Sequence, residues 1–366
     1  MLKRLLCIVG KMDAGGAENM LMKLYRTVDK KRVQFDFACF TNEEGFFDKE
    51  ILSMGGRIFR LGTIPLKNYP YKRIMSVYDF FQLHKYDYVL QSTEQAHMAL
   101  FSLIAKIAGV DVIAMRATNS SACRGRLFDN FEKCLRFLPC FVADVKFAPS
   151  KLSADFLFGR NADVQILNNG INITKFQYNE NLRRLKRKEF LFQNKLVIGH
   201  IGRFSKQKNH IFVIDVFVKI LEKNSCAIFL LIGTGELYHN IKKYVDALGI
   251  TDRVIFAGVR KDVSELMMAM DSLVFPSFYE GMPNVVIEAQ TTGLPCLVSD
   301  TITEECKVTD KVEFLSLKNS ALEWANKALS MINNDTKRED YAGKMKVAGY
   351  DIKDVAKTFL NSMKLV

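Results

Sequence analysis

The sequence predicts an α/β protein built from two doubly wound parallel sheets. Three observations lead to this prediction. Strand-like and helix-like segments alternate along the chain, and a charged stretch, QYNENLRRLKRKEFLFQN at 177–194, interrupts the alternation before it starts again. The 366 residues are also enough for two domains of roughly 150–200 residues each. Such alternation is typical of parallel sheets covered by helices. We expect domains over 1–178 and 179–351, with a terminal helix at 352–366 that packs back on the first.

The first half contains the pattern of one complete sheet. Strand-like apolar runs lie at 5–10, 32–40, 57–61, 86–90, 110–115, 145–148 and 164–167. Segments with apolar residues at helical spacing lie between the earlier strands, at 17–29, 46–54, 74–83 and 96–108.

The second half repeats the pattern after the charged stretch. Its expected strands are 196–201, 227–232, 254–257, 273–275 and 295–298, and its expected helices are 211–222, 237–248 and 285–292. From about residue 316 the chain is expected to be helical to its end.

Composition limits the class of protein. A hydrophobic content of 49% and a charged content of 25% are ordinary for a soluble globular protein. The net charge of +12 favours an anionic partner, either nucleic acid, an anionic membrane surface or a phosphorylated small molecule. The eight cysteines form no CxxC pair, which indicates reduced thiols and a cytoplasmic location. No apolar run approaches the ~18–20 residues of a membrane span.

A glycine-rich loop follows the first strand. In VGKMDAGGAEN, Gly15 and Gly16 stand directly before a helix, where free backbone N–H groups and the helix dipole favour an anion. The loop matches neither GxGxxG nor the Walker pattern, so an ordinary tight turn is an equal alternative.

A basic loop follows the first strand of the second half. GHIGRFSKQKNH places Arg203 and Lys208 five positions apart after Gly202. An arginine that donates two parallel hydrogen bonds and a lysine ammonium on one loop could together bind a diphosphate. The alternative is a basic loop that is simply exposed to solvent. Glycine turns also follow the next two strands, in LLIGTGE and FAGVRKD.

Two glutamates flank a turn in FYEGMPNVVIEAQ. Glu280 is expected on the loop after a strand, and Glu288 just over one turn into the following helix, with Pro283 near that helix's start. Three roles are open: an acid and a nucleophile for glycoside hydrolysis, metal ligands, or acceptors for sugar hydroxyls. The third fits best beside Arg203 and Lys208, and no DxD pair occurs in the chain.

Together these motifs resemble the family 4 retaining glycosyltransferases of the GT-B architecture, particularly enzymes that build bacterial capsule or exopolysaccharide repeat units. The resemblance rests on the Gly15–Gly16 loop, NNGIN at 168–172, GRFSKQKN at 202–209, GTGE at 233–236, FAGVRKDV at 256–263 and EGMPNVVIE at 280–288. It implies two Rossmann-like domains facing across a cleft. It also implies metal-independent, retaining transfer of a sugar from a nucleotide-sugar, expected to be a UDP-sugar, to a glycan or a polyprenyl-diphosphate-linked acceptor. No cofactor or metal is expected.

The resemblance also assigns roles to residues. Catalytic roles fall to Arg203, Lys208 and Glu280, and donor-binding roles to Gly16, Gly202, Val259, Gly281, Met282, Pro283, Asn284 and Glu288. Relatives commonly carry histidines after the fourth and fifth strands of the first domain. Here the nearest residues are His97 and Arg116, whose contribution the sequence leaves open.

The sequence also leaves other interpretations of function open. The segments 66–86 and 124–141 mix basic and aromatic residues, which suggests peripheral docking at the inner face of the cell membrane or plain amphipathic helices. An epimerase or phosphorylase of the same architecture, or a non-catalytic sensor of sugar nucleotides, would carry similar motifs. A nucleic-acid binder is disfavoured because the basic residues are dispersed and no nucleic-acid motif is present.

Overall fold

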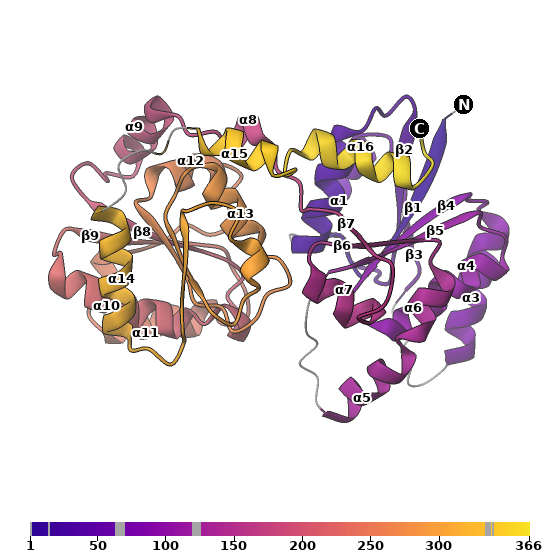
Figure 1. Cartoon of the computed structure of the whole chain (residues 1–366), viewed down its shortest axis with the longest axis horizontal. Helices are drawn as coiled ribbons and strands as arrows, with labels where there is room; N and C mark the ends of the chain where they lie inside the picture. Colours follow the sequence, from indigo (N-terminus) through magenta and orange to yellow (C-terminus); the bar gives the residue numbers. More distant parts are fainter. Residues whose placement is uncertain (1, 14, 63–69, 119–125, 334–337, 339) are drawn as a thin grey trace. The chain divides into compact units, whose positions relative to one another are not determined.

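The chain folds into two compact units, each a parallel sheet with helices on both faces (Figure 1). The structure is a computed structural model that describes residues 2–13, 15–62, 70–118, 126–333, 338 and 340–366. Unit 1 comprises Met1–Gly170 and Ile352–Val366, and unit 2 comprises Ile171–Asp351. The fold class expected from the sequence is confirmed. The first unit ends before the expected residue 178 because the short helix α8, Ile173–Phe176, packs on helices of unit 2.

The sheet of unit 1 has seven parallel strands in the order β3-β2-β1-β4-β5-β6-β7. Their bounds are β1 Lys3–Val9, β2 Val33–Cys39, β3 Ile58–Arg60, β4 Tyr88–Thr93, β5 Val112–Ala117, β6 Val145–Ala148 and β7 Gln165–Ile166. The helices are α1 Gly16–Thr27, α2 Asp48–Ser53, α3 Pro70–Leu83, η1 Ala96–Met98, α4 Ala99–Ile107, α5 Arg126–Leu135, α6 Phe137–Val142, α7 Lys151–Phe158 and α16 Ile352–Ser362.

Alternate side chains of these strands build two separate cores. One core lies between the sheet and helices α1 and α16, which lie side by side, and it contains Phe35 and Phe359. The other lies under α3, α4, α6 and α7 and contains Val89 and Ile113. Helix α16 therefore belongs to unit 1 although its residues come last in the chain.

The sheet of unit 2 has six parallel strands in the order β10-β9-β8-β11-β12-β13. Their bounds are β8 Leu196–Ile201, β9 Ala227–Ile232, β10 Val254–Phe256, β11 Ser272–Phe275, β12 Cys296–Ser299 and β13 Val312–Leu315. The helices are α8 Ile173–Phe176, α9 Glu180–Glu189, η2 Lys206–Lys208, α10 His210–Lys223, α11 Tyr238–Ala247, η3 Thr251–Arg253, α12 Val263–Ala269, α13 Asn284–Thr291, η4 Glu304–Cys306, α14 Ala321–Asn333 and α15 Tyr341–Val347.

Two cores again lie on either face of this sheet. Helices α10, α11 and α14 cover one face around Phe217 and Trp324. Helices α12, α13 and α15 cover the other around Met267 and Ile287. Strand β13 is an addition to the five strands expected here; its Val-Glu-Phe-Leu run is only four residues long and mostly half-buried.

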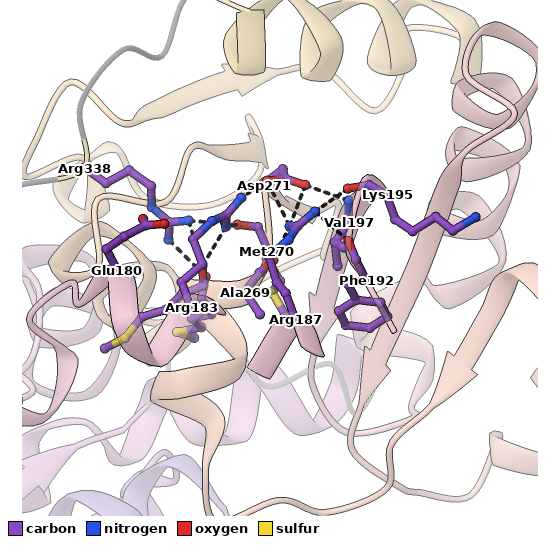
Figure 2. Close-up of polar contacts among 12 residues, drawn as sticks. Glu180, Arg183, Arg187, Phe192, Lys195, Val197, Ala269, Met270, Asp271 and Arg338 are labelled. Atoms are coloured by element: carbon purple, nitrogen blue, oxygen red, sulfur yellow. Dashed lines mark hydrogen bonds and ion pairs between the residues drawn. The ribbon is translucent and has the colours of Figure 1, made fainter. Parts of the chain in front are cut away.

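The charged stretch 177–194 is part of unit 2, because its helix α9 is fastened to the amino end of the sheet (Figure 2). Arg183 donates to Asp271 at 2.5 Å, and Arg187 donates to the same carboxylate at 3.2 and 3.3 Å. Asp271 also accepts the N–H of Val197 at 2.8 Å. This carboxylate therefore joins α9 to the starts of both β8 and β11.

A third arginine completes this cluster. Arg338 donates to the carbonyls of Met267 and Met270 at the end of α12, at 3.0 and 2.8 Å, and Arg183 also donates to Met270 at 2.8 Å. Cations suit the carbonyl-rich end of a helix. We call Asp271, Arg183, Arg187 and Arg338 the amino-edge cluster. It fixes β8 and β11, the strands that carry the candidate site at their other ends.

Among the described residues, no helix combines the length and the apolar character needed to cross a lipid bilayer.

Candidate functional site

The candidate site lies at the carboxyl ends of β8 and β11 in unit 2. These strands are neighbours, and the strand order reverses between them. In open α/β sheets, ligands bind outside the carboxyl ends of the strands at such a switch point. The loop after β8 carries Arg203 and Lys208, and the loop after β11 carries Glu280.

Lys208 and Glu280 form the centre of the site. The Lys208 Nζ lies 2.5 Å from Oε1 of Glu280, and their side chains are only 15% and 11% exposed. The same ammonium lies 4.7 Å from the centre of the Phe275 ring, an arrangement that holds a cation over an aromatic face. The pair therefore joins the two loops across the switch point.

Gly202 makes room for the lysine stem. A Cβ atom at this position would lie 3.1–3.2 Å from three methylene carbons of Lys208. Because that distance is tighter than ordinary van der Waals contact, a side chain at position 202 would push on the Lys208 stem. The glycine thus sets where the ammonium can lie.

Hydrogen bonds hold the two loops in one arrangement. The side chain of Gln207 donates to the carbonyl of Tyr279 at 2.8 Å, and the N–H of Phe278 donates to the carbonyl of Gln207 at 2.9 Å. Asn209, in the left-handed region at φ 54°, donates from its side chain to the carbonyl of Pro276 at 3.2 Å. Asparagine tolerates this backbone conformation, so it can begin α10 directly after the turn.

The glycines of the next loop allow close backbone contact. Gly233 has φ 136°, and a Cβ atom there would lie 2.0 Å from the carbonyl oxygen of Gly202. A Cβ atom at Gly235 would lie 2.6 Å from the carbonyl oxygen of Phe204. The GTGE motif therefore packs the loop after β9 against the basic loop, and the N–H of Gly233 bonds the carbonyl of Gly258 after β10 at 2.9 Å.

Two buried histidines lie beneath the basic loop. His200 donates from Nδ1 to the carbonyl of Val274 at 2.9 Å, because a carbonyl oxygen can only accept and Nδ1 must therefore carry the proton. His210 stacks on Phe204, with ring centres 4.2 Å apart, and lies 4.7 Å from His200. Burial, with the charge of Lys208 second, lowers the pKa of His210 to about 4, and burial also holds the pKa of His200 well below its usual value. Both rings are neutral at pH 7.

The remaining predicted residues of unit 2 differ in burial and in position along the chain. Arg203 is 75% exposed and makes an ion pair of 3.2 Å with Glu236. Gly281, Met282 and Pro283 are buried in the turn, Asn284 begins α13, and Glu288 lies half-buried one turn later on the same helix. Val259, after β10, is more than half exposed.

Unit 1 holds three further predicted residues. Gly16 is the first residue of α1, and the carboxylate of Glu18 folds back over the preceding glycine, where a Cβ atom would lie 2.2 Å from it. The pKa of Glu18 is raised, mainly by burial. The helix start therefore already faces a carboxylate of the chain itself.

His97 and Arg116 have partners that the sequence did not suggest. His97 bonds through Nδ1 to the carboxylate of Glu132 on α5, which also accepts the N–H of Ala96 at 2.5 Å. Arg116, on β5, is 2% exposed and donates to the side chain of Asn169. Glu132 was missed because its segment reads simply as an amphipathic helix.

The unit 2 arrangement suits a ligand that is both anionic and rich in hydroxyls. The largely buried ammonium of Lys208 can bind phosphate oxygens, and the carboxylate of Glu280 beside it can accept hydrogen bonds from hydroxyls. Within the described ranges, no group of three or more His, Cys, Asp or Glu side chains is close enough together to hold a metal ion.

Comparison with known proteins shows relatives along the whole chain. Residues 182–346 match the family described as "Glycosyl transferases group 1". EpsF of Bacillus subtilis (strain 168), named a glycosyltransferase, is 32% identical over 368 residues that cover 98% of this chain and 96% of EpsF. The Escherichia coli UDP-Gal:alpha-D-GlcNAc-diphosphoundecaprenol alpha-1,3-galactosyltransferase is 27% identical over 72% of this chain and 70% of that protein.

Solved structures show the same fold. The Anabaena protein HepE in complex with UDP-glucose superposes with a TM-score of 0.81 over 99% of this chain and 100% of HepE, at 17% sequence identity. WaaG, a glycosyltransferase involved in lipopolysaccharide biosynthesis, superposes with a TM-score of 0.72 over 98% of both chains, again at 17% identity. With a relative that is one-third identical along the full length, and with these folds, the chain belongs to the group 1 glycosyltransferases of the GT-B fold.

Proposed function

We propose that this glycosyltransferase moves a hexosyl residue from a UDP-sugar to a lipid-linked glycan, with retention of anomeric configuration and without a metal ion, during synthesis of a cell-surface polysaccharide. The observation that carries the proposal is the Lys208–Glu280 pair, which places a cation and a hydroxyl acceptor together at the switch point of unit 2. The names of the relatives support it: the E. coli enzyme uses a UDP-sugar and a diphosphoundecaprenol acceptor, and HepE holds UDP-glucose.

The basic residues would act on the leaving group. As the bond between the sugar and the diphosphate breaks, negative charge develops on the phosphate, and Lys208 would stabilise it from a fixed position. Arg203, on the exposed part of the same loop, would add a bidentate contact to the phosphate after its ion pair with Glu236 breaks. Two such cations supply the positive charge that a metal ion would otherwise provide.

The acidic residues would bind the carbohydrate part of the donor. Glu280 would accept hydrogen bonds from sugar hydroxyls, and Glu288 would accept those of the ribose. Backbone N–H groups of 281–284 would bind sugar or phosphate oxygens, Val259 would lie against the base, and Gly16 would let the donor approach unit 1. Retention follows if the acceptor hydroxyl attacks the face that the diphosphate leaves, with the departing phosphate oxygen taking the hydroxyl proton.

The acceptor would be presented at a membrane. A polyprenyl-diphosphate acceptor lies in the lipid phase, and the +12 charge of the chain suits an anionic leaflet. Of the two segments that suggested membrane docking, 66–69 and 124–125 lie outside the described residues. Phe131, Phe137 and Phe141 on α5 and α6 are more than half exposed, which agrees with a peripheral contact.

Donor binding tests the proposal. We expect Arg203→Ala and Glu288→Ala each to weaken binding of the correct UDP-sugar by more than ~1.5 kcal/mol, or about 12-fold, the scale of charge-assisted hydrogen bonds. Lys219→Ala, which removes an exposed partner of Glu222, is the matched control and should leave affinity unchanged. The donor itself would be found by thermal stabilisation with a panel of UDP- and GDP-sugars.

The results that would contradict the proposal are specific. Unchanged donor affinity in both Arg203→Ala and Glu288→Ala would contradict the donor-binding roles proposed for these residues. Release of an epimerised sugar in the absence of acceptor would indicate an epimerase, and loss of transfer on addition of EDTA, restored by a divalent metal, would remove metal independence. Salt-sensitive binding to duplex DNA that is indifferent to UDP would indicate a nucleic-acid binder.

A further inference from the structure

Arg116 is a buried cation without a carboxylate partner in the described part of the chain. Its side chain is 2% exposed, and its one hydrogen bond there runs from Nη2 to the neutral amide of Asn169, itself 7% exposed. The Nε atom is buried and has no hydrogen-bond partner among these residues. Burial lowers the pKa of the guanidinium to about 10. The side chain is still charged at pH 7.

An uncompensated buried charge is unusual. Removing an ion from water costs far more free energy than a single bond to a neutral amide returns. Unit 2 shows the ordinary solution, since its largely buried Lys208 has a carboxylate at 2.5 Å. The counter-charge that Arg116 lacks within the described residues can come from a bound anion.

A second orphan donor lies beside it. Ser92 of β4 is the register partner of Arg116 of β5, and partners on neighbouring parallel strands point to the same side of a sheet. The hydroxyl oxygen of Ser92 is buried and, like Nε of Arg116, has no hydrogen-bond partner in the described structure. Two unsatisfied donors from adjacent strands thus lie on one face of the sheet.

The position of these groups favours a ligand. Ser92 and Arg116 are each the second-to-last residue of their strand. They therefore lie at the carboxyl edge of the sheet, where open α/β sheets bind ligands. Both lie on the face that α1 and α16 cover, because Leu90 and Ala114, two residues earlier on the same strands, belong to that core. A guanidinium and a hydroxyl at such an edge match the oxygens of a phosphoryl group.

We propose that Arg116, Ser92 and Asn169 form an anion site in unit 1 that binds a phosphoryl group of the acceptor's diphosphate. The inference rests on the proposed function, which makes the acceptor a diphosphate-linked glycan. Arg116 would donate through its Nε–Nη2 edge, Ser92 through its hydroxyl, and Asn169 would orient the guanidinium. These residues bind the acceptor and take no part in the transfer of protons.

The experiment uses the full chain carrying Lys208→Met, which weakens the other diphosphate contact, with inorganic pyrophosphate as the probe. We expect pyrophosphate to raise the Tm of this protein, and Arg116→Met in the same background to weaken pyrophosphate binding by at least ~30-fold. Ser92→Ala should weaken it about fivefold. Lys106→Met, which removes a cation of unit 1 paired with Asp144, is the control and should leave binding unchanged.

A second measurement separates binding from structure. Without pyrophosphate, Arg116→Met should raise the Tm of the protein, because it removes an uncompensated charge and keeps the stem. A structural role alone would lower the Tm and leave the response to pyrophosphate intact, which would overturn the proposal. Arg116→Lys keeps the positive charge but loses the planar guanidinium that donates two parallel hydrogen bonds. This variant should therefore bind pyrophosphate with intermediate affinity.

Two further measurements identify the source of the anion and test the proposed function separately from the anion site. Geranyl diphosphate should compete with pyrophosphate in an Arg116-dependent manner, and geraniol should not. A response to orthophosphate that geranyl diphosphate fails to reproduce would overturn the assignment to a lipid-linked acceptor. UDP binding is measured separately with native Lys208. If UDP does not bind, the donor half of the proposed function fails, while the pyrophosphate result still decides the anion site.

Discussion

The two edges of the sheet in unit 2 use their charges in opposite ways. At the amino edge, Arg183, Arg187 and Arg338 direct their donors to Asp271 and to carbonyls at the end of α12. At the carboxyl edge, Lys208 pairs with the carboxylate of Glu280, and Arg203 makes an exposed ion pair with Glu236. The first arrangement ties helices to strands, whereas the second leaves cations that a ligand can take over. The charges that stabilise the fold thus lie at one end of the neighbouring strands β8 and β11, and the charges to which we assign donor binding lie at the other end.

The largest expected effect is at the amino edge. Asp271→Asn would leave Arg183 and Arg187 without their shared carboxylate, in a cluster whose side chains are 15–19% exposed. Removing one partner of a buried ion pair costs about 3 kcal/mol, so the free energy of unfolding by urea should fall by that amount. Donor affinity of the folded protein should not change.

The control for Asp271 is Glu222→Gln, which breaks an exposed pair with Lys219 and should cost less than ~0.5 kcal/mol. A loss of donor affinity without a loss of stability in Asp271→Asn would contradict the separation of the two edges.

The next effect is at the carboxyl edge and concerns binding. Lys208→Met keeps the stem that lies against Gly202 but removes the ammonium. Affinity for the UDP-sugar should fall about 100-fold, or about 2.7 kcal/mol, since a charge-assisted contact to the diphosphate is lost. Isothermal titration calorimetry measures this directly.

Lys206→Met is the matched control, because Lys206 is an exposed cation of the same short turn, η2. Equal losses in the two variants would mean that the loop acts only through its overall charge.

A smaller effect comes from the histidines beneath the basic loop. His210 has a pKa of about 4 in the folded protein and about 6.5 in the unfolded chain. The unfolded state therefore binds more protons between these values, and stability falls as the pH falls through this window. His210 alone should cost about 1.4 kcal/mol between pH 8 and pH 5.5. Chemical denaturation across this range measures the slope.

His210→Phe tests the assignment, since phenylalanine can keep the stacking on Phe204 and cannot titrate. The slope should become smaller but not vanish, because the pKa of His200 is lowered by burial as well. An unchanged slope would place the pH dependence elsewhere.

The sequence was sufficient for the sheet architecture because strand cores carry a strong local signal. Runs such as 196–201 and 227–232 coincide with β8 and β9. Helix α9 was not predicted, since its apolar content is low and its stability comes from arginines that reach Asp271, more than 80 residues away in the chain. Local patterns do not contain such a partner.

The candidate site shows the same limit. The order of the motifs indicated that Lys208 and Glu280 would meet, because both follow strands of one parallel sheet. The sequence could not distinguish the buried Lys208 from the exposed Arg203, since their loop is a single run of polar residues. It also could not show that His97 has Glu132 as a partner, which depends on how α5 packs beside η1.

The smallest effect concerns Arg203. Its partner Glu236 is 54% exposed, and such surface pairs contribute little to stability, so Glu236→Gln should change the free energy of unfolding by less than ~0.5 kcal/mol. The same change removes a carboxylate that competes with the diphosphate for the guanidinium. Donor affinity should therefore rise about threefold, and the gain should disappear in Arg203→Ala. A fall in affinity would mean that Glu236 itself binds the donor. Glu236 would then be a donor-binding acid of the carboxyl edge and not a competitor of the diphosphate for Arg203.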